Sequence, residues 1–320
     1  MPPIPFPLFA ERVRNLYARR RPKTARRVDQ VLRTLQALRD GRGRPLVRTT
    51  ADLTTDTACR FLAAQGPDAN PNTLRGLLGS LSALCTYAVD EDWLDRAPKF
   101  KRLRPRKSPP IRPRHRPYAE VHRLLVHLRD RPGGWKARRD YALAATVALT
   151  GLRLGEALHL WIEDVALAGR VLRVVPRGGV PLKTESSARA VPLCAELATI
   201  LRAWIPWAAP GPWLFPGVKR RGPWDGGNPA DRALGRLQAA AREVGIDWIS
   251  YHALRHSFAT IALEHWGLPT WTVQKILGHT SLRTTENYLH LDEVAPLVEA
   301  VGALGFGLTD DDRGGRRVTA

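Results

Sequence analysis

The sequence predicts a mainly α-helical chain of two domains with one small β-sheet, which places it in the α+β class. Its 320 residues leave room for two domains of roughly 100–200 residues each. Apolar residues recur at helical spacing along most of the chain, whereas residues 170–193 have the composition of β-strands. A basic, proline-rich segment at 99–116 separates the two helical regions. With 44% hydrophobic and 25% charged residues, the composition excludes wholesale disorder, collagen and coiled coil.

Residues 1–98 are expected to form a small helical domain. Within them, residues 24–38 carry an apolar stripe with a 3.6-residue period, and arginines fill the opposite face. Residues 72–88 repeat this design, with Asn72 as the expected N-cap. Because such stripes form the core first, only the arginines on the opposite face are candidates for contact with a nucleic acid.

The positive charge is concentrated in the N-terminal third of the chain. The formal net charge is +20, and residues 1–117 hold 25 Lys and Arg against 10 Asp and Glu. The segment 99–116 contains four prolines and no acidic residue, so it is expected to be an interdomain linker that packs no core. Two readings stay open: a solvated spacer that repels itself, or a strap along a phosphate backbone, where each neutralised phosphate releases counterions. Under the second reading, the candidate contacts are Lys99, Lys101, Arg102, Arg104, Arg106, Lys107, Arg112, Arg114 and Arg116.

The second domain is expected over residues 117–306, followed by a disordered tail at 307–320. Helices are predicted first, then the small sheet, then helices again. The second helix should end at Gly151, which can take the left-handed conformation of a C-cap. The predicted helices are 118–128, 140–149, 232–244, 254–264, 270–277 and 282–289.

Several classes of protein are disfavoured. The longest apolar run, residues 141–149, is far shorter than the roughly 20 residues of a membrane span. The prolines and late arginines of the first residues do not fit a signal peptide. Three widely spaced cysteines form neither a disulfide framework nor a metal site. We therefore expect a cytoplasmic protein without a membrane partner.

Candidate catalytic side chains lie in four segments of the second domain: TGLRLGEAL, LKTESSARAVPL, YHALRHSFAT and LGHTSLRTTENYLH. All but one of them are hydrogen-bond donors or cations, and the exception is a phenol. Such a set suits a phosphodiester, whose oxygens accept hydrogen bonds from guanidinium groups. Each residue alone is weak evidence, but their order and spacing are not. The residues are Arg153, Lys183, His252, Arg255, His279 and Tyr288.

This order of residues resembles that of the tyrosine recombinase, or phage integrase, family, whose boxes match the four segments. The resemblance implies a helical core-binding domain and a catalytic domain that clamp DNA between them. It also implies that Tyr288 is the nucleophile, that Lys183 is the general acid, and that Glu156 occupies an accessory acidic position. The front of the chain accommodates one small domain, so we expect no further N-terminal arm-site domain.

The chemistry of such a set can be reasoned from charge. A phenolate that attacks a backbone phosphate needs donors for the non-bridging oxygens in the transition state. Arg153 and Arg255 can supply them in place of metal ions, with His279 as a third donor. His252 can help to take the tyrosine proton. The bond energy is then conserved in a 3′-phosphotyrosine, so no metal, ATP or other cofactor is required.

The resemblance further implies double-stranded DNA with inverted-repeat sites as the partner. A monomer is expected free in solution, and a homotetramer or heterotetramer on synapsed DNA, with accessory DNA-bending proteins as further candidate partners. Two alternatives remain: a nicking-closing enzyme like type IB topoisomerases, and a catalytically silent DNA-binding member of the fold. The C-terminal helix could dock on its own domain or on a neighbouring protomer.

Two residues near the predicted site are left without a catalytic role. His256 is expected to be structural, because we expect it to point about 100° away from His252 around a helix. Arg189 is read either as a surface charge of the hairpin or as a phosphate contact, with no preference between them.

Overall fold

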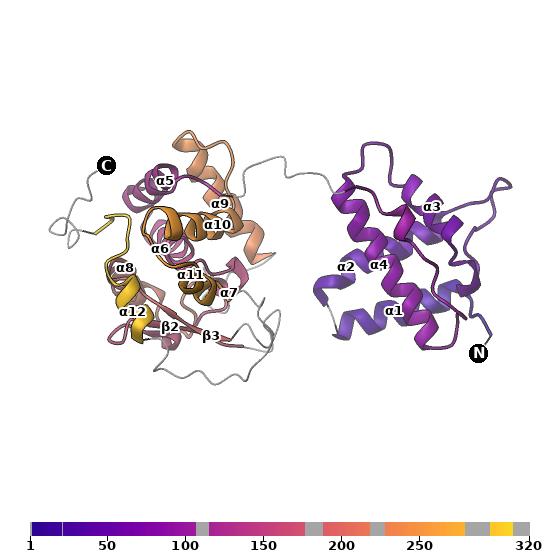
Figure 1. Cartoon of the computed structure of the whole chain (residues 1–320), viewed down its shortest axis with the longest axis horizontal. Coiled ribbons are helices and arrows are strands. Elements are labelled where there is room, and N and C mark those ends of the chain that lie inside the picture. Colours follow the sequence, from indigo (N-terminus) through magenta and orange to yellow (C-terminus); the bar gives the residue numbers. More distant parts are fainter. Residues whose placement is uncertain are drawn as a thin grey trace. The chain divides into compact units, whose positions relative to one another are not determined.

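A computed structural model describes residues 2–20, 22–106, 115–176, 188–217, 228–278 and 295–309 (Figure 1). The chain divides into two compact units, Met1–Ile111 and Arg112–Ala320. In the described part of the chain, no helix is long and apolar enough to cross a membrane.

The first unit is helical. It contains α1 (Phe6–Arg20), α2 (Pro22–Ala37), α3 (Thr55–Ala63) and α4 (Pro71–Asp90), with 3₁₀ turns at Thr50–Asp52 and Lys101–Leu103. The N-cap of helix α4 lies two residues earlier than expected, at Asn70, whose side chain accepts a hydrogen bond from the Asn72 backbone at 2.9 Å. Pro71 takes the first helical position, where its missing N–H is not needed.

The core of the first unit is built from the predicted stripes. Val31, Leu32 and Leu35 of α2 are fully buried, and Leu81 and Leu84 of α4 pack with them. Burial of such apolar side chains away from water is the main contribution to the stability of the folded first unit.

The expected linker starts inside this unit, which corrects its first boundary. Phe100 is 6% exposed and belongs to the first core, and the turn Lys101–Leu103 follows it directly. Arg75 of α4 then donates a hydrogen bond to the carbonyl oxygen of Pro105 at 2.7 Å. Phe100, the partly buried Leu103 and the Arg75 hydrogen bond together fix the start of the basic stretch to the helices.

The second unit is mostly helical with one small sheet. Its elements before the sheet are α5 (Tyr118–Asp130), α6 (Gly134–Thr150) and α7 (Leu154–Leu158), then a 3₁₀ turn at Ile162–Asp164. After the sheet come α8 (Ala195–Ala208), α9 (Pro229–Glu243), α10 (Tyr251–Glu264), α11 (Thr270–Leu277) and α12 (Ala295–Val301). The helix expected at 282–289 lies outside the described residues.

The sheet has three antiparallel strands in the order β1 (Val165–Ala166), β2 (Val171–Val174) and β3 (Arg189–Pro192). Val174 pairs with Arg189 in the β2–β3 ladder, so the two strands form the two sides of a hairpin. Lys183 lies between these strands in the sequence, outside the described residues. The strand β1 precedes the expected range, because two residues are too few to produce a visible alternation.

Helix α6 is the centre of the second core. Its residues from Ala142 to Thr150 are all buried, and it contacts α5, α8 and α10. A helix that is apolar on every side is typical of such a position. The hydroxyl group of Thr146 is satisfied within the helix, by donation to the carbonyl oxygen of Ala142 at 2.7 Å.

The C-terminal segment of the described chain packs on its own unit. Leu297 and Val301 of α12 are buried, and α12 contacts β3. The carboxylate of Glu196 accepts hydrogen bonds from the backbone N–H groups of Phe306 and Leu308. The tail expected from 307 therefore starts later, since Leu308 is 3% exposed.

Candidate active site

The segment that follows α6 is shaped by Gly151. This residue ends the helix with a positive φ of 64°, in the left-handed region. A Cβ atom there would lie 2.5 Å from Leu277 Cδ2 and 2.6 Å from Phe258 Cδ1. Only glycine satisfies both the conformation and the space. The sharp turn at Gly151 leads directly to Arg153, which is the N-cap of α7.

Glu156 holds Arg153 at the start of α7. Its Oε2 accepts the Arg153 backbone N–H at 2.9 Å, and its Oε1 accepts Arg153 Nη1 at 2.8 Å. The Arg153 side chain is 36% exposed, whereas that of Glu156 is 6% exposed. The guanidinium group is thus fixed by a buried carboxylate and still reaches the surface.

Arg189 completes the environment of Glu156. Its Nη2 lies 3.0 Å from Glu156 Oε2 and its Nη1 lies 3.4 Å from Oε1. Burial works to raise the pKa of Glu156, but the hydrogen bonds and charge of Arg189, together with the bonds from Arg153, outweigh it, so the pKa lies below its usual value. Glu156 is therefore an ionised carboxylate at neutral pH.

Arg255 lies next to this cluster, on α10. The N-cap of this helix is Ser250, whose hydroxyl oxygen accepts a hydrogen bond from the Ala253 N–H group at 3.0 Å. Arg255 is 4% exposed and donates to the carbonyl oxygen of Gly151 at 2.5 Å and to that of Leu277 at 2.7 Å. Burial, with the charge of Arg153, lowers the pKa of Arg255 to about 10, so the group stays protonated at neutral pH.

His252 and His256 form a pair on the same helix. Their Nε2 atoms are 3.0 Å apart, and their ring planes meet at 77° with centroids 4.4 Å apart. The expected separation of about 100° was wrong, because residues four apart on an α-helix differ by only about 40° and lie one turn apart. His256 is in contact with a predicted catalytic side chain.

The structure brings together three of the predicted site residues, Arg153, Glu156 and Arg255, with His252 on the same helix as Arg255. Lys183, His279 and Tyr288 lie outside the described residues.

Arg189 is buried and was not recognised from the sequence. A signal was present: in strand β3, alternate residues face the same side, and Val191 is fully buried. Arg189 shares that side, so the reading as a surface charge is wrong: it is 8% exposed.

The expected DNA-contact residues fall into three groups. Exposed positions at the end of the first unit are Lys99, Lys101, Arg102, Arg104 and Arg106. Lys107, Arg112 and Arg114 lie outside the described residues. Arg116 differs from the expectation: its guanidinium group donates to the carbonyl oxygen of Trp248 and to Glu120, and its backbone N–H donates to Ser257 Oγ at 2.7 Å. This side chain is bound to its own unit.

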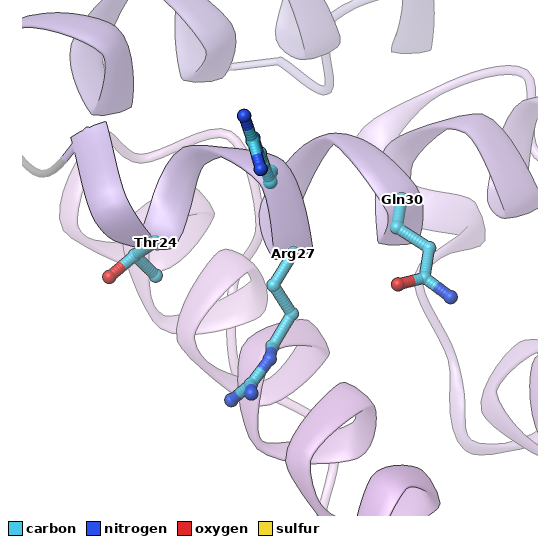
Figure 2. Close-up of a pocket in the computed structure, with 4 residues that line it drawn as sticks. Thr24, Arg27 and Gln30 are labelled. Carbon is cyan, nitrogen blue, oxygen red and sulfur yellow. The ribbon is translucent and has the colours of Figure 1, made fainter. Parts of the chain in front are cut away.

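A basic surface pocket of about 520 Å³ lies on α2 of the first unit. Thr24, Arg26, Arg27 and Gln30 line it, and Figure 2 shows Arg27 extending between Thr24 and Gln30. The guanidinium group of Arg27 lies over Gly76 of α4, where a Cβ atom would be 3.4 Å from Nη1. Among the described residues, no carboxylate forms an ion pair with Arg26 or Arg27, whereas Arg14 and Arg33 share Asp29.

The family model described as the phage integrase family matches residues 118–294 of the chain. Tyrosine recombinase XerC of Methylobacterium sp. is 34% identical over 257 residues, which are 78% of this chain and 68% of that protein. XerC of Bifidobacterium longum is 31% identical over 49% of this chain and 44% of that protein. XerD of Brucella suis is 33% identical over 49% of this chain and 50% of that protein. For the last two, the chain matches about half the length of its relatives.

Solved structures of integrases have the same fold. The Tn1549 transposon integrase in complex with a circular intermediate DNA matches with a TM-score of 0.65 and 18% identity, over 97% of this chain and 96% of that one. A lambda integrase dimer bound to a COC′ core site matches with a TM-score of 0.63 and 16% identity, over 90% of this chain and 100% of that one. The predicted mainly helical fold with a small sheet is confirmed.

Proposed function

Because the chain belongs to the phage integrase family, we propose that it is a tyrosine-type site-specific recombinase that cleaves and rejoins DNA strands. One observation carries the proposal in this chain. Two predicted phosphate-binding arginines, Arg153 and Arg255, lie in one cluster around the ionised carboxylate of Glu156. The Leu277 carbonyl oxygen bound by Arg255 is two residues before His279, at the start of the segment that contains Tyr288.

The proposed reaction begins with attack of the Tyr288 phenolate oxygen on the phosphorus atom. A tyrosine–phosphorus bond forms and the bond to the 5′ oxygen breaks. The phenolic proton passes toward His252, and Lys183 donates a proton to the leaving 5′ oxygen. Attack by another 5′ hydroxyl group on the 3′-phosphotyrosine reverses these steps and joins a new pair of ends. The bond energy is retained throughout, so ATP is not consumed.

The guanidinium groups stabilise the charge that develops on the non-bridging oxygens. Arg153 is the exposed member of the cluster and can meet the phosphate, while Glu156 keeps its orientation. Arg255 adds a second positive charge that persists at neutral pH. We assign His279 a third hydrogen bond to these oxygens. Donors fixed before the substrate arrives need no reorganisation in the transition state, so a metal ion is not needed for this role.

We propose that double-stranded DNA with inverted-repeat sites is the partner. The exposed cations at the end of the first unit, from Lys99 to Arg106, and the basic pocket around Arg27 support this assignment. Lys107, Arg112 and Arg114 remain proposed contacts, whereas Arg116 is withdrawn because it binds Trp248 and Glu120 of its own unit.

The assembly that we propose is a monomer in solution and a homotetramer or heterotetramer on synapsed DNA. Accessory DNA-bending proteins are further proposed partners. The proposed location is the cytoplasm, on the nucleoid when the protein is bound to DNA.

The test is a covalent adduct on denaturing gels. The protein is mixed with nicked duplexes made from inverted repeats that flank its gene, because the nick lets the short 5′ product leave and traps the adduct. Wild type should give a shifted covalent band in EDTA, and Tyr288→Phe should bind the same DNA without such a band. A band that persists in Tyr288→Phe would refute the nucleophile. Tight binding to the cleavable repeats without any wild-type band would refute the proposed activity.

A further inference from the structure

Arg189 is a buried charge of the second unit that the proposed reaction does not use. Its two terminal nitrogens bind both oxygens of Glu156, at 3.0 and 3.4 Å. Its Nε donates to the carbonyl oxygen of Ile276, near the end of α11, at 2.9 Å. A guanidinium group has a fixed planar fork, so these bonds determine where its partners lie relative to one another.

These bonds join three segments that each lead to a predicted catalytic residue. Arg189 itself is in β3, on the side of the hairpin that follows Lys183. Glu156 belongs to α7, whose N-cap is Arg153. Ile276 lies three residues before His279.

The coupling between Arg189 and Arg153 is direct through Glu156. Oxygen Oε1 accepts from Arg153 Nη1 and Arg189 Nη1, and Oε2 accepts from the Arg153 backbone and Arg189 Nη2. Each carboxylate oxygen is therefore shared between the two arginines. Without Arg189, each carboxylate oxygen keeps only its bond to Arg153, so the carboxylate and the Arg153 guanidinium group are held less firmly.

Gly278 adds a second restraint at the same place. It has a φ of 63°, and a Cβ atom on it would lie 3.1 Å from Arg189 Cδ and 3.2 Å from Nε. The Arg189 side chain thus packs against the backbone immediately before His279. Both its aliphatic part and its guanidinium group hold the end of α11.

We propose that Arg189 is a positioning residue for DNA strand cleavage, which orients Arg153 through Glu156 and fixes the end of α11 against strand β3. This inference rests on the proposed recombinase function. Arg189 does not touch the DNA in this account, since it is 8% exposed and its nitrogens are engaged with Glu156 and Ile276. Its loss should therefore change the rate of the chemical step more than the affinity for DNA.

The test compares Arg189→Met and Arg189→Lys with a matched control, Arg139→Met. Arg139 is also a buried arginine of the second unit, 2% exposed, and it donates to the Pro216 carbonyl oxygen at 3.0 Å. Both methionine variants remove one buried charge of the same size. Thermal unfolding reports their stability, and the covalent-adduct rate is measured in a single turnover at saturating nicked DNA, below the unfolding temperature of each variant.

We expect Arg189→Met to lower the saturated rate of adduct formation about 10–100-fold, as loss of a supporting partner does at metal-ligand sites. The dissociation constant for DNA should stay near that of wild type. Arg189→Lys should be faster than Arg189→Met but slower than wild type, because lysine keeps the positive charge but cannot make the bidentate contact with Glu156. Arg139→Met should keep the wild-type adduct rate, even if it unfolds at a lower temperature.

The pH profile separates positioning from a general loss of structure. The charged groups that face Glu156 among the described residues are Arg153, Arg189 and Arg255. Without Arg189, the strongest of the interactions that lower the pKa of Glu156 are lost and this pKa rises, so protonation releases Arg153 at a higher pH. The pH below which the rate of adduct formation declines should therefore be higher, and closer to neutral, in Arg189→Met than in wild type. In Arg139→Met this pH should not change.

Each outcome has a distinct meaning. Equal rates and pH profiles in Arg189→Met and wild type would overturn the positioning role and leave the recombinase function intact. Equal losses in Arg189→Met and Arg139→Met would assign Arg189 a purely structural role. A wild-type chain that forms no Tyr288-dependent adduct would overturn the proposed function itself, and this inference with it.

Discussion

At the scale of single residues, the pair His252 and His256 has a consequence for the proton transfer. Their Nε2 atoms are in hydrogen-bond contact at 3.0 Å, so one must donate and the other accept. The partner of one ring nitrogen sets the tautomer and the orientation of the whole ring. The contact therefore couples the two rings: when Nε2 of one histidine carries the proton, Nε2 of the other must accept it.

Replacement of His256 by alanine should slow adduct formation about 10-fold, because the His252 ring loses a fixed orientation. The matched control is His122→Ala on α5, a half-buried histidine that stacks on Tyr118 with centroids 6.1 Å apart. Single-turnover cleavage of nicked DNA measures both rates. If the two alanine variants cleave equally fast, the contact between the histidines has no role in the reaction.

Residues of the candidate site differ in how far the sequence could predict them. The order of polar residues predicts Arg153 and Arg255, the family resemblance implies Glu156, and the structure brings these three together. Arg189 was missed because an arginine next to a polar turn is usually solvated, and only its place in the strand alternation indicates burial. The role of His256 was missed through an error of helix geometry, which the sequence itself could have corrected.

At the scale of elements, the turn after α6 depends on Gly151. Its left-handed conformation is shared with Gly245, which follows α9 with a φ of 72° and has no atom within 4 Å of a built Cβ. An added Cβ would meet different surroundings at the two glycines, since it would meet Leu277 and Phe258 at the buried Gly151 and no atom at the exposed Gly245. They therefore form a matched pair for separating backbone strain from steric overlap.

Gly245→Ala should lower the free energy of unfolding by about 1–2 kcal/mol, the penalty of a left-handed non-glycine residue. Gly151→Ala should lose a further 1–3 kcal/mol, roughly, through overpacking against Leu277 and Phe258. Urea unfolding monitored by tryptophan fluorescence gives both values. Equal losses would mean that these two side chains move aside without strain.

Element boundaries show what periodicity can predict. The helices around the apolar stripes were found because the pattern repeats over several turns. Their ends depend on one or two residues, so the cap at Asn70 was assigned to Asn72, although Pro71 marks the first helical position. The strand β1 is too short to have a pattern, and it exists because it pairs with β2.

At the scale of the whole molecule, the uneven charge is the feature that binding to DNA would use. Residues 1–117 hold 25 of the 50 Lys and Arg but only 10 of the 30 Asp and Glu. Some of these cations are already neutralised: Arg44 pairs with Asp40 at 3.0 Å, and Arg60 pairs with Asp56 at 2.9 Å. The composition of the chain does not distinguish such paired arginines from the exposed cations near the end of the first unit.

That distinction gives a prediction for the dependence of affinity on salt. Replacing Lys101 and Arg104 together by glutamine should reduce the slope of log affinity against log salt by about 1.8, which is about 0.9 for each lost phosphate contact. Replacing Arg44 and Arg60 together removes the same charge from the chain, yet those arginines are paired with acids, so the slope should change little. Fluorescence anisotropy with one duplex at a series of salt concentrations measures both slopes. Equal flattening by the two pairs would mean that total charge, and not a strap of exposed cations along the phosphates, governs the affinity.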